Sequence, residues 1–285
     1  MADEREDAHE TDAAAHETDA AAPGPADARA AASAAPDAEA AAEVRPVRRE
    51  QRARTMGRRV PIAVGIAAVL IAAVLGWLVV VRSGELVDLD EEWAEDMLEL
   101  RGPVGDVLAL LMNWLGGGVV GVFVVPVLAA VVLLICRRPW GAAYFILASA
   151  ASAGVVQLLK QTFGRARPED IMVVSDFGSF PSGHVANAAT IAVALGVIAP
   201  ALWVWIAGAV YTVLMAASRT YLGAHWLTDT LGGLLVGAGV ALLAWAVLAR
   251  PLERERLAWS AHRMEVNAAR AAAHVTPPSG GSARR

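Results

Sequence analysis

The sequence has very little cysteine and little charge. Its one cysteine, Cys136, excludes an internal disulfide and leaves the redox compartment open. Only 19% of the 285 residues are charged and 56% are hydrophobic, whereas about a quarter of a soluble domain is charged. Most of the charge lies in residues 1–59 and 250–285. Uncharged runs such as 60–81 are longer than an ordinary helix in a protein core. These deficits exclude a soluble globular enzyme, a disulfide-stapled secreted module and a wholly disordered chain.

Both ends of the chain have the composition of polar tails. Residues 1–44 are mostly Ala, Asp, Glu, Thr and Pro, and HETDAAA occurs twice. This stretch has no apolar periodicity to bury, so we expect an acidic disordered tail and not a secretory signal peptide. We assign residues 1–59 to a cytoplasmic tail that ends in a basic segment, and 250–285 to a partly helical cytoplasmic tail. The net charge of −5 gives no indication of nucleic-acid binding.

Six apolar segments between the tails, over residues 60–249, predict an all-α membrane bundle. They lie at 61–81, 117–136, 140–159, 185–199, 201–217 and 226–249. The fourth is short: it reaches about 23 Å, against a hydrocarbon core of about 30 Å. Small residues such as Gly233 and Gly237 allow helices to approach closely, which favours packing inside one bundle over a dimer contact. The oligomeric state stays open.

The distribution of arginine predicts the orientation in the membrane. Seven arginines precede the first apolar segment within residues 45–59, whereas the following stretch, 82–116, has two arginines and nine acids. The positive-inside rule therefore places both termini in the cytoplasm. An amphipathic helix on the outer surface is expected over residues 85–100, where apolar residues recur at helical spacing: Leu86, Leu89, Trp93, Met97 and Leu100.

Four cations fall at the predicted outer face, where the rule expects few. Lys160, Arg165 and Arg167 follow the third apolar segment, and Arg219 follows the fifth. Interfacial anchoring explains one or two such side chains. Four of them indicate an anionic ligand, and the planar fork of guanidinium suits phosphate because it bonds two oxygens at once.

The predicted membrane domain has two histidines, and both fall at the same face. Asp229 lies four residues after His225, on the same side of a helix. A carboxylate on one ring nitrogen fixes the tautomer and leaves the other nitrogen free to attack. An acid inside an apolar segment is a functional candidate, although a solvated pair at a helix end is the alternative.

The tetrapeptide at residues 181–184 supplies a second candidate group. Ser182 can cap the following helix, Gly183 lets the backbone approach a ligand, and the first amides of the helix carry partial positive charge. A phosphate could bind there with His184 as its proton donor. Taken alone, Pro-Ser-Gly is also an ordinary turn.

Together these residues resemble the three-part signature of the type 2 phosphatidic acid phosphatase family, which also contains the vanadium haloperoxidases. The pattern KxxxxxxRP, PSGH and SRxxxxxHxxxD is matched at every fixed position by residues 160–168, 181–184 and 218–229. The resemblance covers roughly residues 61–249 and does not extend to the tails.

The resemblance implies an integral membrane lipid phosphatase that needs no metal and no cofactor. In that scheme His225 attacks phosphorus, Asp229 orients it, and His184 protonates the leaving group. The phosphoryl oxygens are held by Lys160, Arg167, Ser182, Gly183 and Arg219. Arg165 lies outside the pattern, so we expect it to be peripheral.

The substrate and the acceptor are left open by the sequence. Undecaprenyl pyrophosphate, phosphatidic acid, phosphatidylglycerol phosphate and diacylglycerol pyrophosphate all fit the signature. A phosphotransferase that uses the same site is an alternative. A transporter or lipid-binding protein is disfavoured, because apart from Asp229 the apolar segments offer only Gln157 and Asn187 as strongly polar groups.

Overall fold

The structure is a computed structural model that describes residues 57–81 and 85–275. Every regular element in this part of the chain is helical, which confirms the all-α class. The elements are the helix Gly57–Val81, α2 (Glu85–Glu99), α3 (Pro103–Gly116), the π-helical turn η1 (Val120–Val124), α4 (Val125–Ile135), α5 (Pro139–Phe163), α6 (Gly183–Ile198), α7 (Leu202–Tyr221) and α8 (Leu227–Val275). The predicted disordered tail at 1–44 lies outside the described residues.

Several of these helices are long and apolar enough to cross a bilayer. Four qualify singly: Gly57–Val81, α5, α7 and α8. Helix α3 and the segment Val120–Ile135 qualify as one pair bent by 45°, which raises the number to as many as five. Helix α6 is apolar but has only 16 residues, about 24 Å of helix. The total of six crossings stays a prediction that depends on α6.

The second apolar segment begins earlier than predicted. We expected a polar stretch up to residue 116, but α3 starts at Pro103, a residue favoured at the first position of a helix. Asp106 and Asn113 concealed this helix by interrupting its apolar run, and both have partners in the fold. The break after α3 falls at Gly117 and Gly118, where Gly118 has a φ of 57°.

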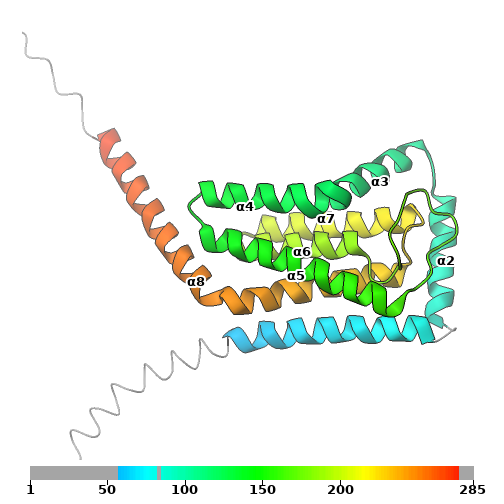
Figure 1. The fold of residues 1–285 in the computed structure, drawn as a ribbon. Helices are drawn as coiled ribbons and strands as arrows, with labels where there is room; N and C mark the ends of the chain where they lie inside the picture. The colour runs from blue at the N-terminus through cyan, green and yellow to red at the C-terminus, as the bar shows by residue number, and fades with distance from the viewer. Residues whose placement is uncertain (1–56, 82–84, 276–285) are drawn as a thin grey trace, which may run out of the picture. The chain divides into compact units, whose positions relative to one another are not determined.

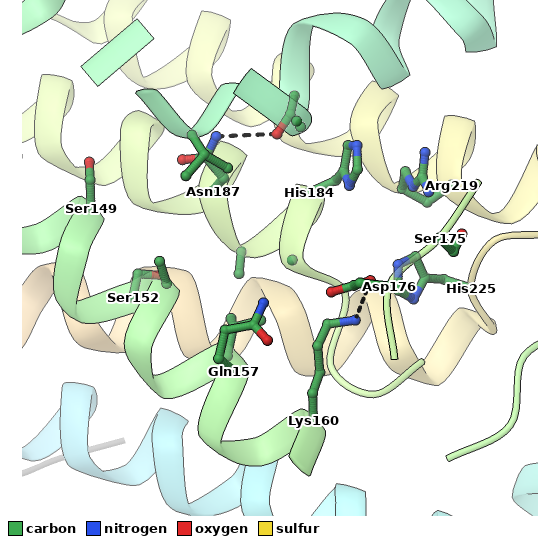
Figure 2. A pocket seen from close by; sticks show the side chains of 18 of the residues that line it. Ser149, Ser152, Gln157, Lys160, Ser175, Asp176, His184, Asn187, Arg219 and His225 are labelled. Atoms are coloured by element: carbon green, nitrogen blue, oxygen red, sulfur yellow. Dashed lines mark hydrogen bonds and ion pairs between the residues drawn. The ribbon is translucent and has the colours of Figure 1, made fainter. Parts of the chain in front are cut away.

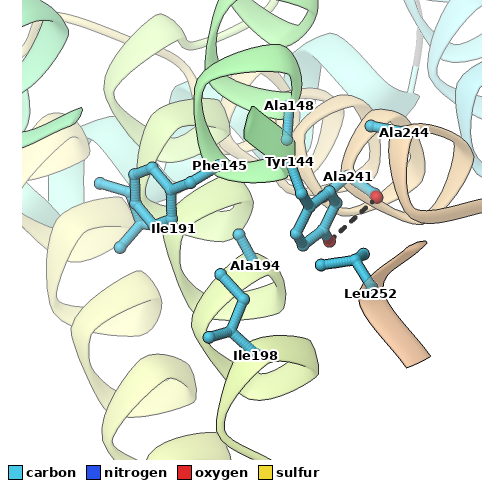
Figure 3. Close-up of a cluster of buried hydrophobic side chains, with 9 residues drawn as sticks. All are labelled: Tyr144, Phe145, Ala148, Ile191, Ala194, Ile198, Ala241, Ala244 and Leu252. Carbon is cyan, nitrogen blue, oxygen red and sulfur yellow. Dashed lines mark hydrogen bonds between the residues drawn. The ribbon is translucent and has the colours of Figure 1, made fainter. Parts of the chain in front are cut away.

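Helix α6 packs against α5, α7 and α8 and forms the centre of the bundle (Figure 1). Its apolar side chains join a core cluster with Tyr144 and Phe145 of α5, in which the Tyr144 hydroxyl donates to the carbonyl of Ala241 at 3.1 Å (Figure 3). A Cβ atom at Gly237 of α8 would overlap the backbone of Ala186 in α6. This glycine therefore serves packing inside the bundle, as predicted.

Helix α2 forms where the amphipathic pattern predicted a helix, and it packs on α7 and α8. The residue of α2 that is most buried in the protein does not belong to the apolar pattern. Leu89 is 45% exposed, and Leu100, which follows the helix end, is 66% exposed. Asp90, in contrast, is only 1% exposed. The inward face of α2 thus carries a buried acid.

Helix α8 continues well beyond the predicted end of the membrane segment at residue 249. It contains Pro251 and runs on to Val275. Past the proline, Glu255 accepts hydrogen bonds from the backbone N–H groups of Trp140 at 2.6 Å and Gly141 at 3.0 Å. Glu255 therefore satisfies the free amides at the start of α5.

Candidate active site

The three signature segments meet around one cavity of about 480 Å³ (Figure 2). Helix α5 ends at Phe163 because Gly164 takes a left-handed conformation, with a φ of 52°, and this places Lys160 in the last helical turn. The other walls are formed by the break after α3, the loop between α5 and α6, the start of α6, the end of α7 and the turn before α8. Six predicted site residues line the cavity: Lys160, Arg167, Gly183, His184, Arg219 and His225.

A carboxylate of the protein itself lies between two of the cations. Lys160 Nζ is 3.2 Å and Arg167 Nη2 is 2.8 Å from Oδ1 of Asp176, and both cations also donate to the carbonyl of Gly178. Burial raises the pKa of Asp176, but Lys160 and Arg167 outweigh it and hold the pKa below its ordinary value. Asp176 is therefore ionised, and its carboxylate occupies the space between the two cations.

His225 lies just before α8 and is 3% exposed. Its Nδ1 atom is 3.5 Å from Oδ2 of Asp229, and its Nε2 atom is 3.3 Å from Nη1 of Arg167. Burial, followed by the charges of Arg219 and Arg167, lowers the pKa of His225 well below 6.5. The imidazole is thus neutral near pH 7. Because Arg167 can only donate, Nε2 is the unprotonated nitrogen, and the proton lies on Nδ1, which faces Asp229 without forming a hydrogen bond among the described residues.

Asn113 of α3 holds two of the predicted site residues. Its side-chain oxygen accepts a hydrogen bond from Nη1 of Arg219, and its backbone carbonyl lies 3.2 Å from Nε2 of His184. Sequence reasoning missed Asn113 because it lay in the stretch assigned as polar. A lone amide in an otherwise apolar helix was the available indication.

Ser182 occupies the N-cap position of α6, as predicted, but its side chain makes no capping hydrogen bond. Within the described part of the chain its buried hydroxyl has no hydrogen-bond partner, whereas its backbone N–H donates to the carbonyl of Asp229 at 2.9 Å. Gly183 opens α6 and lines the cavity, so the free amides of this helix start beside the cations.

The expectation that Arg165 is peripheral was wrong. Its side chain is 9% exposed, and Nη1 lies 2.6 Å from Oδ1 of Asp229. The same nitrogen donates to the Thr228 hydroxyl at 2.7 Å. Arg165 therefore contacts the acid that faces His225, and it does not line the cavity. Its position two residues before Arg167, outside the signature, gave no indication of this role.

The cavity continues from the cations along α5 into the apolar part of the bundle. Its lining there includes Ser149, Ser152, Gln157 and Asn187 (Figure 2). Asn187 also donates to the carbonyls of Gly116 and Gly121, at 3.2 and 2.9 Å, and so joins α6 to the break after α3. The polar residues weighed as transport candidates therefore belong to the same cavity as the signature.

Within residues 57–81 and 85–275, no group of three or more His, Cys, Asp or Glu side chains lies close enough together to hold a metal ion.

Residues 141–252 match the family model described as the PAP2 superfamily. YbjG of Escherichia coli K12, which carries the provisional name undecaprenyl-diphosphatase, is 32% identical over 152 residues, which cover 48% of this chain and 74% of that protein. The chain belongs to the PAP2 superfamily.

Other PAP2 relatives are shorter matches. Phosphatidylglycerophosphatase B of Bacillus subtilis 168 is 36% identical over 111 residues, which cover 35% of this chain and 55% of the relative. The undecaprenyl-diphosphatase of Sulfolobus acidocaldarius is 41% identical over 66 residues, which cover 23% of this chain and 32% of the relative. The chain thus matches about a third to about half of the length of these two proteins.

A solved structure shares the arrangement of the helices. The crystal structure of a transmembrane PAP2-type phosphatidylglycerolphosphate phosphatase from Bacillus subtilis superimposes with a TM-score of 0.56 at 27% identity, covering 63% of this chain and 93% of the other. The resemblance inferred from the signature is confirmed, and this PAP2 chain is a multi-pass membrane protein.

Proposed function

We propose that this PAP2 protein is a lipid phosphatase that hydrolyses a lipid phosphomonoester or pyrophosphate through a phosphohistidine. The position of Asp176 carries the proposal. Lys160 and Arg167 bind its carboxylate, and Arg167 also lies 3.3 Å from Nε2 of His225. A phosphoryl group that replaces this carboxylate lies beside the nitrogen that attacks it.

The first half of the reaction transfers the phosphoryl group to the enzyme. Nε2 of His225 forms a bond to phosphorus as the bond to the leaving oxygen breaks, and His184 gives that oxygen a proton. Lys160, Arg167 and Arg219 stabilise the charge on the phosphoryl oxygens. Phosphoryl transfer depends mainly on such positioning and charge stabilisation.

In the second half, water cleaves the phosphorus–nitrogen bond. His184, now without its proton, accepts one from the water, and inorganic phosphate leaves with His225 restored. Ser182, whose buried hydroxyl has no hydrogen-bond partner among the described residues, and the amide of Gly183 bind phosphoryl oxygens during both steps. Asp229 keeps the ring of His225 oriented. The site uses no metal and no cofactor.

The substrate is a membrane lipid phosphate that enters from the bilayer. The relatives are named for undecaprenyl diphosphate and phosphatidylglycerophosphate, which supports a lipid phosphate without selecting one. We place both termini in the cytoplasm and the site at the outer face, with six crossings that include α6, from the arginine distribution and the even number of crossings.

The test is phosphate release by the detergent-purified protein in excess chelator, across the four candidate lipids. His225→Ala should abolish release and prevent trapping of an acid-labile phosphohistidine. His262→Ala, which changes an exposed histidine on α8, is the matched control and should keep full activity. Near-normal turnover by His225→Ala would show that His225 is not the nucleophile. A strict magnesium requirement would contradict the metal-free site.

A further inference from the structure

Arg165 binds two buried carboxylates that come from distant parts of the chain. Nη1 lies 2.6 Å from Oδ1 of Asp229 in α8, and Nη2 lies 2.7 Å from Oδ2 of Asp90 in α2. The side chains of Asp90 and Asp229 are 1% and 0% exposed. Buried charges persist where they are paired, and a single guanidinium here neutralises part of the charge of both acids.

Asp90 is held from a second direction by the start of α8. Its Oδ1 accepts the backbone N–H of Thr228 at 2.8 Å, and its Oδ2 accepts the Thr228 hydroxyl at 2.6 Å. Asp90 therefore caps the first turn of α8 from another helix, as an N-cap residue would do from within the chain. This contact fixes α2 against the turn that carries Asp229.

The two oxygens of Asp229 have different partners. Oδ1 faces Arg165, while Oδ2 accepts the backbone N–H of Trp226 at 2.9 Å and lies 3.5 Å from Nδ1 of His225. The Trp226 ring lies under Arg165, with its centroid 5.5 Å from the guanidinium carbon. Rotation of the Asp229 carboxylate toward or away from His225 therefore requires the Arg165 contact to change.

Asp90, Arg165 and Asp229 do not line the cavity, so these three residues influence the reaction through other groups and not by contact with the substrate. We propose that Arg165 and Asp90 are positioning residues, which hold Asp229 so that its second oxygen orients His225 for attack, and that α2 takes part in catalysis through Asp90. This inference rests on the phosphatase function proposed above. The four groups form one line of contacts, Asp90–Arg165–Asp229–His225.

The fork of arginine suits this task, because its two terminal nitrogens reach two carboxylates at once, whereas the single nitrogen of lysine serves as a point charge. Arg165→Lys should therefore keep the charge but lose one of the two contacts. Arg165→Gln loses the charge altogether. Asp90→Asn is nearly isosteric and keeps an acceptor for Thr228.

The first readout is steady-state kinetics per folded protein. Misplacement of a reacting group by about 1 Å costs about 100-fold in rate, so Arg165→Gln should lower kcat about 100-fold with KM nearly unchanged. Arg165→Lys and Asp90→Asn should give smaller losses of kcat. The matched control is Arg138→Gln, because Arg138 is also a buried arginine that pairs with an acid. Its Nε atom lies 3.5 Å from Oε1 of Glu255, and Arg138 does not line the cavity. This variant should leave kcat unchanged.

The second readout is the acid limb of kcat/KM, which follows the protonation of His225 in the free enzyme. Loss of the positive charge of Arg165 leaves Asp229 less compensated, so Arg165→Gln should move the limb to higher pH. Loss of the negative charge of Asp90 should move it to lower pH. The groups that face His225 are unchanged in these variants: Lys160 from α5, Arg167 and Asp176 from the loop, His184 from α6, Arg219 from α7 and Asp229 from α8.

Opposite shifts in the two variants, with kcat lowered and KM preserved, would support the positioning role. Equal kcat losses in Arg165→Gln and Arg138→Gln, or an unmoved acid limb in both Arg165→Gln and Asp90→Asn, would overturn it. A raised KM in Arg165→Gln would overturn it as well, since that result would place Arg165 on the phosphate. Failure of the proposed phosphatase function is distinct, because it would appear in the wild-type protein as absence of phosphate release.

Discussion

Replacement of Asp176 should make the enzyme bind its substrate more tightly. The Asp176 carboxylate lies between Lys160 and Arg167, which bind the phosphoryl group in the proposed reaction, so the substrate has to displace it. Asp176→Asn keeps the shape of the side chain and removes its charge. The two cations are then free to bind the phosphate without competition.

The magnitude follows from the exposure of this carboxylate. Its side chain is 55% exposed, so its ion pairs with Lys160 and Arg167 are screened by solvent. Partly exposed pairs contribute about 0.2–1 kcal/mol each, and two of them about 1 kcal/mol. Removal of this competition should lower KM about fivefold. The kcat value should change little, because Asp176 leaves before the chemical step.

The assay measures KM for the lipid substrate and the inhibition constant of inorganic phosphate, for the wild type and Asp176→Asn. Asp170→Asn is the matched control, since Asp170 is an exposed acid in the same loop and its side chain does not line the cavity. Both constants should fall in Asp176→Asn alone. A rise in both would refute the reasoning, because it would show that Asp176 holds Lys160 and Arg167 in place for the phosphate.

Three further outcomes are expected. The depressed pKa of His225 should keep its ring neutral as the pH falls below 6.5, so kcat/KM, corrected for substrate ionisation, should decline only at clearly lower pH; a decline centred at pH 6.5 or above would contradict this. Gly237→Val should lower the free energy of unfolding by about 1–3 kcal/mol, measured by thermal unfolding in detergent, because the new side chain would meet the backbone of Ala186. Gly154→Val, at an open position, should not lower it. Deletion of residues 1–44 should leave turnover unchanged, and an inactive truncated enzyme would show that this segment takes part in catalysis.

The sequence alone predicted the cations and histidines that line the cavity, because their order and spacing form a signature. His184, His225, Lys160, Arg167 and Arg219 come from distant segments, and the structure brings all five to one cavity. Periodicity and charge likewise predicted the helical class and the presence of α2. These features are local in the chain, and the pattern of residues therefore records them directly.

The supporting groups were harder to predict, because their roles depend on tertiary contacts. Asp90 is one of many acids in α2, and only its place on the inward face, four residues after Leu86 and three before Trp93, distinguishes it. Arg165 resembles an interfacial anchor until its two carboxylate partners are known. The loop position of Asp176 has no periodicity, so its contact with the cations could not be inferred.

Both ends of α5 are joined to α8, which has a mechanical consequence. At one end Arg165, two residues beyond α5, holds Asp229 in the first turn of α8; at the other, Glu255 of α8 binds the first amides of α5. Because both of its ends are held, α5 resists sliding and tilting against α8. We therefore expect the separation of Lys160 from Asp229 to depend little on the thickness of the surrounding bilayer.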